Sequence, residues 1–216
     1  IDTAFQTMIE SDAQALIIDV RDNPGGSNSF SDPIIAWFAD RPWTFASDFR
    51  IRISEETTAS SAARLASMPE GEGGVDAQYA GLFATAENGE IVSFDLPVAQ
   101  PRDGAQFNRP VYLLVNRYSY SNAVSVGAIL QDYGFGTVAG ETTSDMATTY
   151  GAMETFSLPA TGITVGYPKA HIIRPNGDAR PHPLTPDLRL DFPALRGPED
   201  VVLEQLRGHI AESLNR

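Results

Sequence analysis

Apolar residues along this chain follow two patterns, continuous runs and helical spacing. Continuous runs at 15–21 and 111–115 are bounded by turn residues, which predicts strands buried on both faces, as in a parallel sheet. Helical spacing of apolar positions predicts helices at residues 2–12, 32–40, 121–133 and 198–214. Further strands are predicted at residues 49–53 and 137–140 and within the β-rich segment 152–191. Because strands and helices alternate, the sequence predicts a layered α/β fold.

Residues 55–108 interrupt this pattern, because they are rich in Ser, Ala, Gly and Glu. The segment contains weak helical patterns near 57–68 and 76–86 and a glycine-rich loop at 70–74. We therefore expect one domain, residues 1–216, in which 55–108 is an insertion or a mobile lid. Because the chain starts at Ile1, directly before the first helix and strand, we also expect that N-terminal domains of a longer protein are absent.

Composition narrows the classes of function. The chain has 216 residues, of which 42% are hydrophobic and 20% are charged, as in an ordinary globular protein. Its net charge is −13 and its only lysine is Lys169, so we expect no binding of nucleic acid or of an anionic membrane surface. The absence of cysteine excludes thiolate zinc sites and a thiol nucleophile. No apolar run is long enough to span a bilayer, and we expect neither a metal nor another cofactor.

Residues that could take part in catalysis follow both predicted apolar strands. Ser121 lies between the second strand and a helix, where free backbone N–H groups and the helix dipole stabilise negative charge. The N–H of Asn122 is one candidate oxyanion donor, and Gly25 and Gly26 allow a second backbone segment to approach a substrate closely. We expect the two strands to be neighbours, so that both turns reach one substrate. An ordinary helix N-cap at Ser121 and a plain turn at 23–26 remain the alternatives.

Four segments in order carry a resemblance to a known family: Leu16–Gly26, Val111–Gly134, Gly140–Thr143 and Thr185–Leu188. They resemble motifs of the C-terminal processing (tail-specific) serine proteases, the group that includes tricorn protease. The resemblance implies an α/β, ClpP/crotonase-like layered fold of ββα units. It implies that Ser121, ten residues before Gln131, is the nucleophile, and that the backbone of Gly25, Gly26 and Asn122 forms the oxyanion hole.

The chain departs from the Ser–Lys members of this family. The positions of their lysine and glutamine are occupied by Met146 and Tyr150, neither of which accepts a proton near neutral pH. The chain therefore resembles a branch without the catalytic lysine, closer to tricorn-like members, in which a histidine from a preceding domain is the base. Within the chain we take His171 as the candidate base, and we expect His182 in an exposed loop and His209 on the last helix.

These observations predict the core of a serine endopeptidase that hydrolyses peptide bonds of a peptide or protein substrate. Because its base is expected to come from a missing N-terminal domain, we expect negligible activity from residues 1–216 alone. One alternative is a non-catalytic member of the fold that binds a peptide, a polysaccharide or a protein. Another is a crotonase-like acyl-CoA enzyme, which the scarcity of Lys and Arg disfavours. By resemblance we expect an extracytoplasmic location, periplasmic or secreted.

Overall fold

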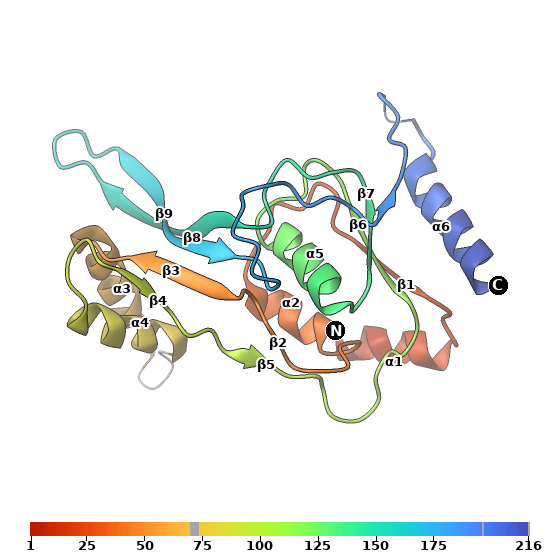
Figure 1. Ribbon diagram of the computed structural model, residues 1–216, viewed down its shortest axis with the longest axis horizontal. Helices are drawn as coiled ribbons and strands as arrows, with labels where there is room; N and C mark the ends of the chain where they lie inside the picture. Colours follow the sequence, from red (N-terminus) through yellow and green to blue (C-terminus); the bar gives the residue numbers. More distant parts are fainter. Residues whose placement is uncertain (70–73, 196, 216) are drawn as a thin grey trace. The chain divides into compact units, whose positions relative to one another are not determined.

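The computed structural model describes residues 1–69, 74–195 and 197–215. Most of the glycine-rich loop expected at 70–74 lies outside the described residues. The chain divides into two compact units. The first comprises Ile1–Ser47, Leu96–Thr148 and Arg174–Arg216, and the second comprises Asp48–Asp95 and Thr149–Ile173 (Figure 1).

A four-stranded parallel sheet forms the centre of the first unit, in the order β1-β6-β7-β10. Its strands are β1 (Leu16–Asp19), β6 (Val111–Val115), β7 (Thr137–Gly140) and β10 (Leu188–Arg189). Leu16 is paired with Val111 and Asp19 with Leu114, so the two predicted apolar strands are direct neighbours. Since parallel strands end at the same edge of a sheet, the turns after β1 and β6 lie at one edge.

Helices cover both faces of this sheet. The helices of the first unit are α1 (Asp2–Glu10), α2 (Asn28–Ile35), α5 (Asn122–Tyr133) and α6 (Val201–Leu214). On β6, Leu113 packs in a cluster that includes residues of α1, α2 and α5, whereas Leu114 packs in a second cluster with Leu206 of α6. Figure 1 shows α5 and α6 on opposite sides of the β6 strand. The predicted α/β fold is confirmed, because β6 is buried on both faces.

A short antiparallel pair completes the regular structure of the first unit. It consists of β2 (Trp43–Thr44) and β5 (Val98–Ala99). Residues 96–108, which the sequence grouped with the insertion, belong to this unit.

The second unit is an antiparallel sheet in the order β4-β3-β9-β8, with two helices. Its elements are β3 (Asp48–Arg52), α3 (Glu55–Ala66), α4 (Gly74–Thr85), β4 (Ile91–Ser93), β8 (Thr149–Ser157) and β9 (Thr164–Ile173). The weak helical patterns therefore correspond to real helices. The lid role of residues 55–108 stays a prediction.

A buried ion network lies inside the second unit. Glu154 is 3% exposed, and its carboxylate contacts Lys169 Nζ at 2.8 Å and Arg64 Nη2 at 2.5 Å. Lys169 Nζ also lies 4.0 Å from the centre of the Tyr79 ring. The only lysine of the chain is thus engaged in holding β8, β9 and the two helices of this unit together.

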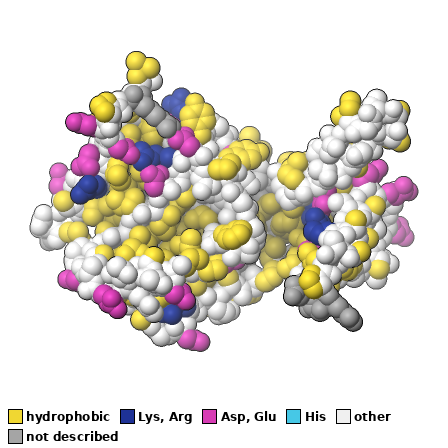
Figure 2. Space-filling model, turned by 180° about the vertical axis from the view of Figure 1, so that it is seen from behind, with side chains coloured by type: hydrophobic (Ala, Val, Ile, Leu, Met, Phe, Trp, Pro, Cys, Tyr) yellow, Lys and Arg dark blue, Asp and Glu magenta, His cyan; other side chains and the backbone are white. Residues whose placement is uncertain are grey.

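On the face drawn in Figure 2, acidic side chains are spread over both units, and Lys and Arg side chains occur in separate small groups. This distribution agrees with the net charge of −13. Within the described residues, no helix is long and apolar enough to cross a membrane.

Candidate active site

The turn after β1 contacts the turn after β6. Gly25 has φ +94°, and a Cβ atom added to it would lie 2.6 Å from Ser121 Cβ and 2.8 Å from the carbonyl oxygen of Tyr120. Only glycine fits there, because both the backbone angle and the space exclude a side chain. The structure therefore brings together the glycine turn and the serine that the sequence singled out.

The two neighbouring glycines differ in their amide groups. The N–H of Gly25 donates to Asn23 Oδ1 at 2.8 Å. Among the described residues, none accepts a hydrogen bond from the N–H of Gly26. Of the two donors expected in this turn, Gly26 is thus the one with a free amide.

Polar side chains fix the loop that carries Ser121. Ser119 is fully buried, and its Oγ donates to the carbonyl of Val20 at 2.8 Å and accepts the N–H of Asn116 at 3.0 Å. The Asn116 side chain exchanges two hydrogen bonds with Asp22, at 2.9 and 3.0 Å. These contacts tie the end of β6 to the end of β1. They hold the loop that carries Ser121 without any contact from the Ser121 side chain.

Ser121 has an uncommon backbone conformation, with φ 54° and ψ −122°. Such angles cost a non-glycine residue about 1–3 kcal/mol and persist only where neighbours impose them. Its N–H donates to Asp145 Oδ2 at 2.6 Å. Its Oγ makes no capping hydrogen bond to α5, so the interpretation as an ordinary N-cap is wrong. Within the described chain the N–H of Asn122, at the start of α5, also has no acceptor.

An apolar pocket of about 260 Å³ opens beside this turn. Its polar edge includes Gly25, Gly26 and Asn122. The side-chain Nδ2 of Asn122 donates to Ser31 Oγ at 3.2 Å. Its apolar lining comes from β1, α2, α5 and the residues next to them, namely Ile18, Val20, Phe30, Ile34, Ile35, Ala123 and Val126. A pocket of this kind accommodates an apolar side chain next to the candidate oxyanion donors.

The candidate base His171 and the only lysine of the sequence, Lys169, both lie in the second unit. His171 is on β9 and stacks on Tyr150, with ring centres 4.7 Å apart. Lys169 is held by Glu154. Met146, at the position of the family's lysine, belongs to the first unit and is 39% exposed. The structure thus does not assemble His171 with Ser121 inside one unit.

The first unit contains a histidine with a carboxylate partner. His182 Nε2 lies 3.0 Å from Asp178 Oδ2. The pKa of Asp178 is held well below its usual range, mainly by hydrogen bonds from Arg180 and also by His182. Sequence reasoning placed His182 in an exposed loop and missed both Asp178 and Asp145, although the Asp-x-x-x-His spacing was visible.

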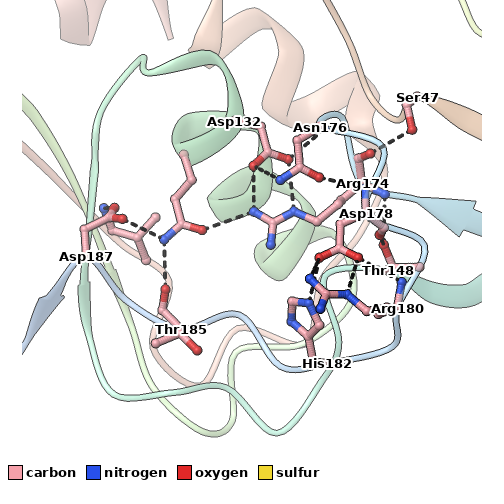
Figure 3. Close-up of polar contacts among 12 residues, drawn as sticks. Ser47, Asp132, Thr148, Arg174, Asn176, Asp178, Arg180, His182, Thr185 and Asp187 are labelled. Carbon is pink, nitrogen blue, oxygen red and sulfur yellow. Dashed lines mark hydrogen bonds and ion pairs between the residues drawn. The ribbon is translucent and has the colours of Figure 1, made fainter.

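Several residues of the recognised motifs have structural roles. Gln131 Nε2 donates to the carbonyl of Thr185 at 2.8 Å and to Asp187 Oδ1 at 3.0 Å, while Asp132 forms an ion pair with Arg174 at 2.7 Å (Figure 3). These contacts hold the segment after Arg174 against α5. These motif residues therefore have a structural role, because they hold the fold together near the loop that carries Ser121.

Comparison with known proteins decides the family. The sequence profile described as peptidase family S41 matches residues 1–190. The chain belongs to peptidase family S41. No sequence of a curated protein matches this S41 chain.

Solved structures share the fold of this S41 chain. A putative peptidase from Parabacteroides merdae ATCC 43184 has a TM-score of 0.65 and is 21% identical, over 97% of this chain and 56% of the other. Mature CPAF has a TM-score of 0.62 and is 19% identical, over 97% and 45%. The photosystem II D1 C-terminal processing protease has a TM-score of 0.53 and is 20% identical, over 88% and 38%. The chain thus spans about half of the length of these proteins, or less.

Proposed function

We propose that this S41 chain is the core of a serine endopeptidase with Ser121 as nucleophile. The observation that carries the proposal is the contact between Gly25 and Ser121 at the start of α5. This contact supports the proposal because the Ser121 hydroxyl, which no described residue engages, belongs to a loop that meets the Gly25–Gly26 turn. The backbone amides of Gly26 and Asn122 have no acceptor in the described chain. Preorganised amides of this kind stabilise the oxyanion of acyl transfer.

The proposed reaction begins with attack of Ser121 Oγ on a peptide carbonyl carbon. The negative charge that develops on the carbonyl oxygen is received by the amides of Gly26 and Asn122 and by the positive end of the α5 dipole. In this assignment Gly25 supplies space rather than a donor, because its N–H is bound to Asn23. Loss of the amine leaves an acyl-enzyme, which water hydrolyses.

The substrate is a peptide or an unfolded protein segment that presents an apolar side chain. The pocket lined by Ile18, Ile34 and Val126 adjoins the proposed oxyanion donors, so it receives the side chain next to the cleaved bond. Exposed Tyr118 and Tyr120 precede the nucleophile in the same loop and offer further apolar contact to a bound chain.

A non-catalytic peptide-binding member of the family is the second candidate function. Met146 favours it, because a thioether at the position of the family's lysine cannot accept the proton of Ser121. This candidate predicts peptide binding without cleavage. A base from a domain outside this chain, as expected from the resemblance, would instead restore cleavage in a longer form.

The test is cleavage of a denatured protein by the 216-residue chain and by any longer natural form, with product ends mapped by mass spectrometry. Ser121→Ala should abolish cleavage, and Ser125→Ala, one turn further along the same helix, should retain it. Cleavage should follow apolar residues. Peptide binding with no Ser121-dependent cleavage by either form would favour the non-catalytic candidate instead.

A further inference from the structure

We propose that Phe30 selects substrates whose side chain in the pocket beside the Ser121 loop is aromatic. The inference rests on the proposed function, because that proposal assigns the pocket to the substrate side chain next to the cleaved bond. It goes further by naming the residue that determines specificity and the class of side chain that it prefers. Three observations carry it: the exposure of Phe30, its position on α2, and the size and chemistry of the pocket.

Phe30 is exposed although its side chain is large and apolar. At 74% exposure it is the most exposed aromatic residue of the described chain. It belongs to neither of the apolar clusters that cover β6, whereas Ile35 of the same helix is fully buried. A single exposed apolar residue needs no explanation by itself, but Phe30 also lines the pocket. Its ring is therefore available to a ligand in that pocket.

The position of Phe30 on α2 places it on the side of the helix that forms the pocket wall. Ser27, Phe30, Ser31 and Ile34 all line the pocket. They are three or four residues apart, so they share one side of the helix and its N-cap. Ile34 packs against the core, whereas Phe30 is exposed. Phe30 therefore forms the outer part of this wall, where a substrate enters.

The same pocket contains the proposed oxyanion donors. Gly26 and Asn122 lie at its polar edge, and α2 begins at Asn28, directly after the glycine turn. The N-cap Ser27 fixes this start, because its side chain accepts the N–H of Ser29 at 3.2 Å. A substrate carbonyl held by the two amides therefore directs the neighbouring side chain into the pocket, against Phe30.

The size and chemistry of the pocket suit an aromatic ring. Its volume is about 260 Å³, and a cavity of about 150 Å³ lined by apolar side chains already binds benzene. No titratable side chain of the described residues lines it, so a charged substrate side chain would be buried there without a partner. An aromatic side chain gains a ring–ring contact with Phe30 that an aliphatic one lacks.

These contacts set an order of preference among substrate side chains. A phenylalanine side chain fills the pocket and contacts Phe30, whereas an alanine side chain leaves the pocket largely empty. Burial of the ring together with one ring–ring contact accounts for a preference of about 10-fold or more. A leucine side chain is buried without the ring–ring contact, so we expect it to lie between the two.

The experiment measures peptide binding by calorimetry to the 216-residue chain carrying Ser121→Ala, so that binding does not depend on cleavage. The peptides consist of glycine and alanine and differ only at one central position, which is Phe, Leu or Ala. The Phe peptide should bind about 10-fold or more tighter than the Ala peptide. Adding Phe30→Ala should reduce this ratio to about 3-fold or less and leave the dissociation constant of the Ala peptide unchanged.

Two further variants separate specificity from a structural effect. Phe30→Asp should reverse the preference, so that a peptide with Lys at the central position binds more tightly than the Phe peptide, because the pocket then offers a partner for a positive charge. Leu195→Ala, at a residue that is 86% exposed and lies after β10, is the matched control and should leave all dissociation constants unchanged. Denaturant unfolding of Phe30→Ala should match that of the parent, because Phe30 is exposed.

The outcomes distinguish this inference from the proposed function. Equal binding of the Phe and Ala peptides, binding of neither, or a preference that Phe30→Ala retains would overturn the inference. Labelling of Ser121 by a small fluorophosphonate tests the proposed function separately, because such a probe has no side chain for the pocket. A Phe30-dependent preference without any labelling or cleavage would support the inference and favour the non-catalytic candidate.

Discussion

Gly25 and Ser121 lie in direct contact at the edge of the parallel sheet: a Cβ atom on Gly25 would be 2.6 Å from Ser121 Cβ. Two residues almost a hundred positions apart in sequence thus form one surface. The contact exists because β1 and β6 are neighbours and because Ser119 and Asn116 lock the two turns together. From this contact, the effects of several substitutions on stability and on the reactivity of Ser121 can be predicted.

Gly25→Ala should impair both folding and labelling of Ser121. The added methyl group meets Ser121 Cβ and the Tyr120 carbonyl, at a φ of +94° that alanine disfavours. We expect a loss of about 2 kcal/mol or more in the free energy of unfolding. Gly26→Ala is the matched comparison: at φ +157° it also strains the backbone, but its methyl group meets nothing within 4 Å, so it should lose less stability. Denaturant unfolding checks this, and equal stability of the two variants would contradict the close contact.

Ser121→Gly should be more stable than Ser121→Ala by about 1 kcal/mol. Both variants lose the hydroxyl, but only glycine adopts φ 54° without strain. The comparison by thermal or denaturant unfolding therefore isolates the backbone strain at the nucleophile. A Ser121→Ala variant as stable as Ser121→Gly would show that the strained conformation is absent in solution.

Asp145→Ala should slow the labelling of Ser121. The carboxylate accepts the backbone N–H of Ser121 at 2.6 Å, so its removal leaves the strained turn without this support and costs about 1 kcal/mol. Asp40→Ala removes an exposed ion pair with Arg41 and should change little. Unchanged labelling of Asp145→Ala would mean that the loop contacts of Ser119 suffice to hold Ser121.

The second unit should lose stability in acid between about pH 4.5 and pH 2. Burial raises the pKa of Glu154, but hydrogen bonds from Arg64 and Lys169 outweigh it and lower the pKa from 4.5 to about 2. A carboxyl with a lowered pKa stabilises the folded state above its unfolded pKa, and this contribution is lost as the pH falls through the folded pKa.

Glu154→Gln tests the same network at neutral pH. The substitution leaves the Lys169 charge buried beside a neutral amide, which should cost about 3 kcal/mol of unfolding free energy. Hydrogen exchange of the β8 and β9 amides measures it within this unit. Glu204→Gln, in an exposed pair on α6, is the control and should have little effect.

Much of the fold was predictable where the apolar pattern is long and regular. The strands at 16–19 and 111–115 and the helix ending at Gly134 were all expected, because each buries a continuous face or ends in a left-handed glycine. Helix α2 instead begins at Asn28, four residues before the predicted start. Its first turn is polar and depends on the cap from Ser27, which apolar spacing does not report.

The candidate site was predictable only in part. Ser121 and the glycine turn lie at strand ends and were found from local sequence. Asp145 contacts the backbone of Ser121 from an irregular segment, where no periodicity indicates which side chains meet.

The central claim is that Ser121 is a nucleophile supported by backbone amides. The most direct measurement is peptide mapping by mass spectrometry after the protein, in the 216-residue form and in any longer natural form, reacts with a fluorophosphonate. We predict a single adduct on Ser121 that is absent from Ser121→Ala and retained in Ser125→Ala. An adduct on another serine, or labelling that persists in Ser121→Ala, would contradict the claim.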